Sequence, residues 1–182
     1  MTAPRLTVVV PTRNRADLAA AAVRSALDSP ESVSVLVSDN SSATADRERL
    51  EASCSDLSSE RLHYVATPSS LSMPNHWEWA RLRAVEETEP THITYLTDRM
   101  LFVPGALAEL LAVARRYPED VVAYNHDTVD DWSHPVRLVQ AQWSGKLLAL
   151  SAEGVLALSA RGDLQHYLPR ALNSIVPVSR LE

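Results

Sequence analysis

Two polar segments, each following an apolar run, carry the residue types best suited to bind a ligand. The first is Pro11-Thr12-Arg13-Asn14-Arg15 and the second is Ser38-Asp39-Asn40-Ser41. Guanidinium groups donate paired hydrogen bonds to anions, and a carboxylate accepts hydrogen bonds from ligand N–H groups. If both apolar runs are parallel strands, the two segments lie at the carboxyl edge of one sheet, where such sheets bind ligands.

The flanking sequence predicts the strands and helices that position these segments. Residues 6–10 and 33–37 are short apolar and β-branched runs, as expected for strands buried on both faces of a parallel sheet. Pro11 is expected to end the first strand. Asn14 is expected to cap a helix with an apolar stripe, and 43–53 to form a second helix.

The same order of strand and helix recurs along the chain. The expected later elements are strands at 62–66, 92–96 and 121–125 and helices at 73 to about 85, from Pro104 onward, and at 152–158. Five strand-helix repeats predict an α/β domain. Met73, Trp77, Ala80 and Ala84 are expected on one helix face, and core packing is favoured over base stacking for Trp77 and Trp79.

Composition narrows the class of protein. The chain has 182 residues with a formal net charge of -6, which favours one domain and argues against nonspecific nucleic-acid binding. Cys54 is the single cysteine, so no internal disulfide framework is expected. No apolar run approaches the length of a membrane span, and we expect a cytoplasmic protein without an integral membrane segment. We expect Leu181-Glu182 to mark either truncation of a longer protein or a cloning scar.

Other common motifs are missing from the sequence. Four glycines in the whole chain form neither a P-loop nor a dinucleotide-binding loop. No Gly-x-Ser-x-Gly motif supports a hydrolase.

Four elements together resemble glycosyltransferase family 2, a large inverting family of GT-A fold enzymes. They are Val8 to Arg15, Val37 to Ser42, Leu71 to Trp77, and Tyr95 to Met100 with Pro104 to Leu107 behind. The resemblance implies a three-layer GT-A (Rossmann-like) domain with a mainly parallel central sheet. We expect 1–182 to be a single domain, with a nucleotide-binding part at 1–126 and an acceptor-side part at 127–182.

The resemblance also implies roles for individual residues. The loop after the first strand touches the nucleotide in this family, which indicates Pro11, Thr12 and Arg13, with Arg13 or Arg15 meeting a phosphate. The acid after the second strand hydrogen-bonds the base, which indicates Asp39. The alternative for Asp39 is an Asx-turn that closes its own loop. Asn75 is expected either near the donor or at a helix cap.

The resemblance departs from the family pattern after the fourth strand. Family members carry an Asp-x-Asp motif there, whose acids hold the ribose and a divalent metal. This chain has Asp98-Arg99-Met100. Mg²⁺ and Mn²⁺ prefer hard oxygen ligands, so a thioether at position 100 gives either metal only weak support. We hypothesise that Asp98 binds the ribose and that Arg99 replaces the metal on the diphosphate; the alternative is an Arg99–Asp98 ion pair.

Inverting transfer needs a base within reach of the acceptor hydroxyl. We choose Asp163, which follows Gly162 in a predicted turn. The other candidates are Asp127, Asp130, Asp131, Glu153 and His166.

The leading functional hypothesis is a glycosyltransferase that moves a sugar from a nucleotide-sugar donor to a hydroxyl acceptor with inversion. The first alternative is a noncatalytic nucleotide-, sugar- or partner-binding domain that has lost the metal-binding acids. The second alternative is a nucleotidyltransferase, which would need metal-binding acids that the sequence does not supply.

Overall fold

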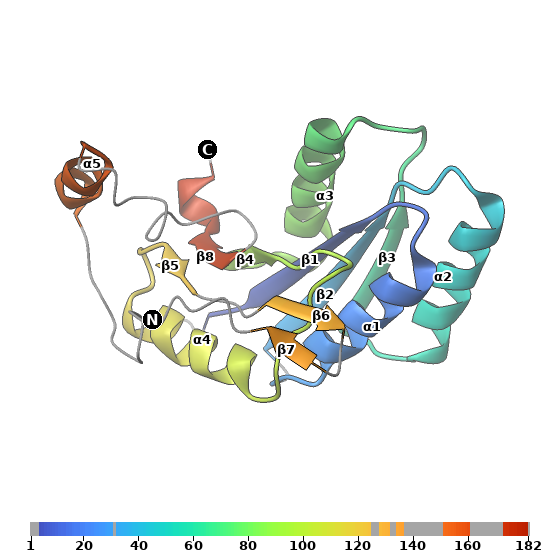
Figure 1. Cartoon of the computed structure of the whole chain (residues 1–182), viewed down its shortest axis with the longest axis horizontal. Coiled ribbons are helices and arrows are strands. Elements are labelled where there is room, and N and C mark those ends of the chain that lie inside the picture. Colours follow the sequence, from blue (N-terminus) through green and yellow to red (C-terminus); the bar gives the residue numbers. More distant parts are fainter. Residues whose placement is uncertain are drawn as a thin grey trace.

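A twisted sheet with helices on both faces organises the chain (Figure 1). Residues 4–30, 32–124, 128–131, 134–136, 151–160 and 173–181 are described in the computed structural model. The strands are β1 (Leu6–Thr12), β2 (Val33–Asp39), β3 (Leu62–Ala66), β4 (His92–Tyr95), β5 (Val122–Ala123), β6 (Thr128–Asp131), β7 (His134–Val136) and β8 (Ser174–Pro177). The helices are α1 (Ala16–Leu27), α2 (Thr44–Asp56), α3 (Met73–Thr88), α4 (Ala106–Arg116), α5 (Ala152–Ala160) and the 3-10 helix η3 (Val178–Arg180).

The six-stranded sheet has the order β3-β2-β1-β4-β8-β5. The pairs β3–β2, β2–β1 and β1–β4 are parallel, whereas β8 is antiparallel to both β4 and β5. The prediction of a mainly parallel α/β sheet is therefore confirmed. The antiparallel strand β8 was not predicted, and β6 and β7 form a separate two-stranded sheet.

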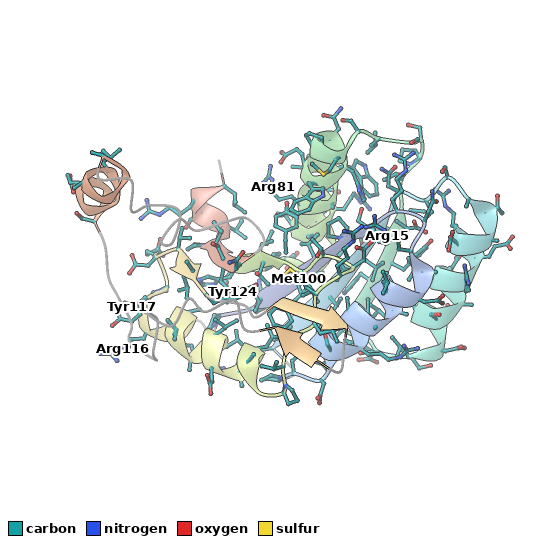
Figure 2. The ribbon with its side chains drawn as sticks, in the orientation of Figure 1. Arg15, Arg81, Met100, Arg116, Tyr117 and Tyr124 are labelled. Carbon is teal, nitrogen blue, oxygen red and sulfur yellow. The ribbon has the colours of Figure 1, made fainter. Side chains whose placement is uncertain are left out.

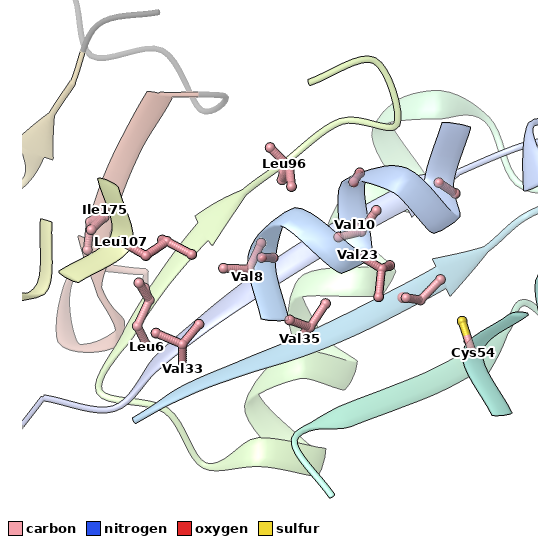
Figure 3. Packing of buried hydrophobic residues seen from close by; sticks show 14 of the residues in the cluster. Leu6, Val8, Val10, Val23, Val33, Val35, Cys54, Leu96, Leu107 and Ile175 are labelled. Carbon is pink, nitrogen blue, oxygen red and sulfur yellow. The ribbon is translucent and has the colours of Figure 1, made fainter. Parts of the chain in front are cut away.

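Alternate residues of β1 bury against opposite helical layers, as the two-residue period of a strand requires. Val8 and Val10 pack in one apolar cluster with Val23 of α1 and Leu107 of α4 (Figure 3). Val9 packs in a second cluster, which includes Leu36 and the α3 residues Ala80 and Ala84. The sheet thus lies between a layer with α1, α2 and α4 and a layer with α3, which gives the three layers expected.

Pro11 does not end β1, which was a wrong prediction. The strand continues to Thr12, and Pro11 pairs with Ser38 of β2. Pairing between β1 and β4 stops at Val9 and Tyr95, and the carbonyl of Val9 accepts the last hydrogen bond, from Leu96. Residues two apart on a strand direct their backbone groups to the same side. The missing N–H of Pro11 therefore faces the side where β4 has already ended, so no ladder hydrogen bond is lost.

Two details of the predicted helices also differ. Helix α4 begins at Ala106 rather than at Pro104, because its N-cap Gly105 has a positive φ of 83°. Met73 was expected on the buried face of α3, but it is 71 % exposed. The buried side chains of α3 are instead His76, Ala80 and Ala84.

We predict that Leu36→Ala lowers the free energy of unfolding by about 2–5 kcal/mol, because it leaves a cavity between β2 and α3. Leu36 is fully buried in the second cluster. The measurement is urea unfolding followed by circular dichroism. The matched control is Leu82→Ala on α3, where Leu82 is 47 % exposed, with an expected change within about 0.5 kcal/mol. Equal losses in the two variants would contradict this packing arrangement.

Candidate active site

The carboxyl ends of β1 and β2 meet in register. Thr12 pairs directly with Asp39, and the next backbone N–H, from Asn40, donates to the carbonyl of Thr12 at 3.0 Å. Both Thr12 and Asp39 are buried. The two predicted polar segments therefore lie side by side at one edge of the sheet.

Asp98 joins this edge from β4. Its Oδ2 accepts a hydrogen bond from Thr12 Oγ1 at 2.9 Å, and its Oδ1 lies 3.2 Å from Nη1 of Arg15. Asp98 is only 5 % exposed, whereas the Arg15 side chain is 43 % exposed. The carboxylate is thus fixed and charge-paired inside the protein, whereas Arg15, labelled in Figure 2, is partly exposed at the start of α1.

Asp39 has hydrogen-bond donors at both carboxylate oxygens. Oδ1 accepts from the backbone N–H of Ser41 at 2.7 Å, which is an Asx-turn, and Oδ2 accepts from the Tyr64 hydroxyl at 2.8 Å. Burial, and then the bond to Asp39, raise the pKa of Tyr64. The alternative role of Asp39 in its own turn is therefore present. Base binding by Asp39 stays a prediction, and a base would have to share or replace the Tyr64 hydroxyl at Oδ2.

Side-chain amides hold the loops around this edge. Asn14 Oδ1 accepts from the backbone N–H groups of Ser42 and Ala43 at 2.9 and 3.1 Å, next to the start of α2. The N-cap of α1 is Arg15, so the prediction that Asn14 caps α1 was wrong. Asn14 has a positive φ of 55°, a conformation that asparagine tolerates better than most residues. This turns its side chain toward the α2 loop instead of its own helix.

Asn40 has the corresponding role on the other side of β2. Its Oδ1 accepts from the N–H of Leu71 and from Thr67 Oγ1, and its Nδ2 donates to the carbonyl of Leu71. These bonds tie the loop before α3 to the end of β2. The polar residues beside the candidate binding groups thus hold the edge in shape without a ligand.

Three other predicted site residues are exposed at or near this edge. Arg13 follows β1, Arg99 follows β4 and Asn75 lies in the first turn of α3. None of the three side chains makes a hydrogen bond or ion pair with the part of the chain that the structure describes. Arg99 therefore does not pair with Asp98, which was the alternative considered, and Arg15 does so instead. Ser72, and not Asn75, is the N-cap of α3. Pro11 is buried.

The residues after β4 do not fit a divalent metal. Thr97 to Met100 form a turn closed by the Met100 N–H to the Thr97 carbonyl at 3.0 Å. The Met100 side chain packs against the apolar cluster beneath α1, so it offers no ligand at the edge. Within the described ranges no group of three or more His, Cys, Asp or Glu side chains could hold a metal ion. Asp98 is left as a single acid whose oxygens already accept from Thr12 and Arg15.

Trp77 has a packing role. Its ring stacks on Tyr95 with centroids 4.9 Å apart, and the Tyr95 hydroxyl donates to the Trp77 carbonyl at 3.1 Å. Tyr95 itself packs on the second apolar cluster. The core interpretation of Trp77 is thus supported by its contacts, while Trp79 is half-buried.

The catalytic base is not identified by the geometry. Asp163, the predicted base, lies outside the described residues, as do Asp127 and His166. Glu153 lies on α5, at the opposite end of the molecule from α1 and α2 in Figure 1.

Sequence reasoning missed three contacts of the edge. It did not pair Arg15 with Asp98, and it did not place Tyr64 on Asp39 or His76 on Ser38. The sequence holds one indication of the Tyr64 contact. Tyr64 lies on β3 two positions before Ala66, which pairs with Asp39, so its side chain is on the same face of the sheet as that of Ala66. The other two contacts depend on side-chain directions that residue spacing does not encode.

Comparison with known proteins defines the class. The family model described as Glycosyl transferase family 2 matches residues 7–155. The chain therefore belongs to this family, as the motif resemblance predicted. No curated protein matches the chain in sequence.

Solved structures show the same GT-A fold. S. aureus TarS 1-349 has a TM-score of 0.53 and 17 % identity, over 70 % of this chain and 38 % of that chain. The mannosyltransferase PcManGT from Pyrobaculum calidifontis, in complex with GDP-Man and Mn²⁺, has a TM-score of 0.52 and 17 % identity, over 68 % and 35 % of the two chains. TarS 1-349 in complex with UDP-GlcNAc has a TM-score of 0.52 and 15 % identity, over 81 % and 37 %. The chain thus spans less than two fifths of each of these structures.

None of the helices in the described ranges is both long and apolar enough to cross a membrane.

Two buried histidines predict how stability depends on pH. Burial lowers the pKa of His76 from 6.5, against opposing effects of the Ser38 carbonyl and of Asp39. Burial likewise lowers the pKa of His92, against the Pro118 carbonyl. Below about pH 6.5 these two histidines therefore bind more protons in the unfolded chain than in the folded protein. The free energy of unfolding is expected to be greatest above this pH and to fall as the pH drops toward the folded-state pKa values.

The measurement is urea unfolding at about pH 7.5 and about pH 5. His76→Gln is expected to lose less stability between the two pH values than the unsubstituted protein does, because one proton-binding group is gone from the unfolded chain. An unchanged difference in both His76→Gln and His92→Gln would contradict the assignment.

Proposed function

We propose that this chain transfers a sugar from a nucleotide-sugar donor to a hydroxyl acceptor with inversion at the transferred carbon. Membership in glycosyl transferase family 2 supports glycosyl transfer in general. One observation supports the site: the hydrogen bond from Thr12 to Asp98, with Asp39 in register beside Thr12, brings three strand ends to one edge. Ligands of parallel α/β sheets bind at such an edge.

Each predicted residue has a part in this proposal. Pro11, Thr12, Arg13 and Asp39 hold the nucleoside, Asp98 the ribose, and Arg99 the diphosphate, with Asn75 nearby. Asp163 removes the proton of the acceptor hydroxyl while the acceptor oxygen bonds to the anomeric carbon of the donor sugar. The bond from that carbon to the diphosphate breaks, and the nucleoside diphosphate leaves with the electron pair. A cytoplasmic location stays a prediction from the sequence.

A noncatalytic nucleotide- or sugar-binding domain is the second candidate. It is favoured by Met100, which packs inward where the family carries its second acid. The two candidates share the nucleotide site and differ in turnover. A nucleotidyltransferase has less support, since Asp98, the acid in the turn that follows β4, is already engaged by Thr12 and Arg15.

Binding is tested by thermal-shift measurement with UDP, GDP, TDP and CMP, each with and without Mn²⁺. A ligand that binds the folded state at about 100 times its dissociation constant adds about 2.7 kcal/mol of stability. At least one nucleoside diphosphate is expected to raise the melting temperature. A hydrolysis and transfer assay with the matching nucleotide sugar then separates the candidates, because binding without turnover on any acceptor favours the noncatalytic domain. No shift with any nucleotide would contradict the proposed function.

The role of Asp39 in base binding predicts opposite behaviour for two substitutions. Asp39→Asn is expected to weaken nucleotide binding about tenfold or more, which is about 1.4 kcal/mol, because the carboxylate accepts from base N–H groups. Tyr64→Phe removes the hydroxyl that competes for Oδ2, so nucleotide binding is expected to persist or to tighten. Isothermal titration calorimetry measures both. If the two variants weaken binding equally, Asp39 serves only its own turn.

A further inference from the structure

In the ion pair between Arg15 and Asp98, the carboxylate is held in place by the protein and the guanidinium is accessible to solvent. Asp98 is 5 % exposed and also accepts from Thr12, so its position is set by the ends of β1 and β4. The Arg15 side chain is 43 % exposed, and its contact with Asp98 is its only side-chain hydrogen bond within the described residues. A guanidinium has five N–H donors, so about four remain for a ligand.

An anion is the ligand that suits these donors. A guanidinium matches the oxygens of a phosphate with paired, parallel hydrogen bonds. Arg13 precedes Arg15 in the same loop, and Arg99 follows Asp98 at the end of the neighbouring strand, both exposed. Three arginines therefore gather at one edge of a chain whose net charge is -6. Such a local cluster attracts an anion that the molecule as a whole repels.

A divalent cation at Asp98 would compete with this arrangement. The metal would need the oxygens that Thr12 and Arg15 already occupy, and it would place two further positive charges beside the guanidinium. The thioether of Met100 supplies no hard ligand in compensation, and it faces the apolar cluster. The side chains around Asp98 thus favour an arginine guanidinium over a bound metal ion as the cation at this position.

We propose that Arg15 binds the donor's diphosphate together with Arg99, that Asp98 positions the Arg15 guanidinium, and that this binding needs no divalent metal. This inference rests on the proposed function, because it names how the same site holds its donor. Arg15 touches the ligand, whereas Asp98 acts on the diphosphate through Arg15. The positive charge also stabilises the nucleoside diphosphate as it leaves.

The test compares Arg15→Ala with Arg24→Ala. Both residues are exposed on the same segment and both changes remove one positive charge, but Arg24 lies in the last turn of α1. Affinities for UDP, uridine, GDP and guanosine are measured by isothermal titration calorimetry in EDTA. Arg15→Ala is expected to weaken binding of the nucleoside diphosphate about tenfold or more, about 1.4 kcal/mol, with the nucleoside unaffected. Arg24→Ala is expected to change neither affinity. Melting temperatures of both variants verify folding.

Two further variants separate binding from structure. Arg15→Lys keeps the charge but not the paired geometry, so a partial loss of diphosphate affinity is expected. Asp98→Asn keeps an acceptor for Thr12 and removes the charge that holds Arg15. It is expected to lower the ratio of diphosphate to nucleoside affinity, which a merely structural defect would leave unchanged.

The outcomes distinguish this inference from the function on which it rests. Equal diphosphate affinity in Arg15→Ala and Arg24→Ala overturns the role of Arg15 and leaves the proposed function standing. Tightening of nucleoside diphosphate binding by Mn²⁺ of about tenfold or more overturns the metal-free part. If the unsubstituted protein binds no nucleoside diphosphate, the proposed function fails, and this inference fails with it.

Discussion

The hydrogen bond from Thr12 to Asp98 joins two neighbouring strands just beyond the point where their ladder ends. On its other side, β1 continues in register with β2 to the pair of Thr12 and Asp39. Thr12 therefore stands between two buried acids that are far apart in the sequence. A buried carboxylate is costly without partners, so each acid needs the donors that surround it. Those donors, Tyr64 and Ser41 for Asp39 and Thr12 and Arg15 for Asp98, determine which groups reach solvent.

The charges at this edge differ from those of the Asp-x-Asp motif that the family pattern has after the fourth strand. The family's second acid is replaced by an inward-facing methionine, and the first acid is neutralised by an arginine. In the proposed metal-free site the positive charge is part of the polypeptide, and its strength does not vary with metal concentration. Net attraction for an anion then depends on ionic strength, because the guanidinium groups are exposed.

The fold class, and the meeting of the two polar segments at one edge of the sheet, could be predicted because both depend on local patterns. The runs that begin at Leu6 and Val33 are apolar at every position except Thr7 and Ser34, and their polar ends follow at once. What failed depended on neighbours in space. Pro11 remains in the strand only because β4 has ended beside it, and Asn14 turns to α2 because the α2 loop lies within reach. Strand β8 pairs with β4 and β5, which are distant from it in the sequence. Its own residues do not specify this position in the sheet.

The position of β8 has a consequence for the order of folding. His92 of β4 pairs with Pro177 of β8, while β1, β2 and β3 pair only with strands that precede β8 in the chain. During synthesis, β1 to β4 are complete long before β8 leaves the ribosome, and domains generally fold as their residues become available. Until then one side of β4 carries unpaired backbone groups next to the apolar Ile93, a template for pairing with other chains. Closing so distant a contact is also slow. Protection of that strand during synthesis is thus a requirement that the topology itself imposes.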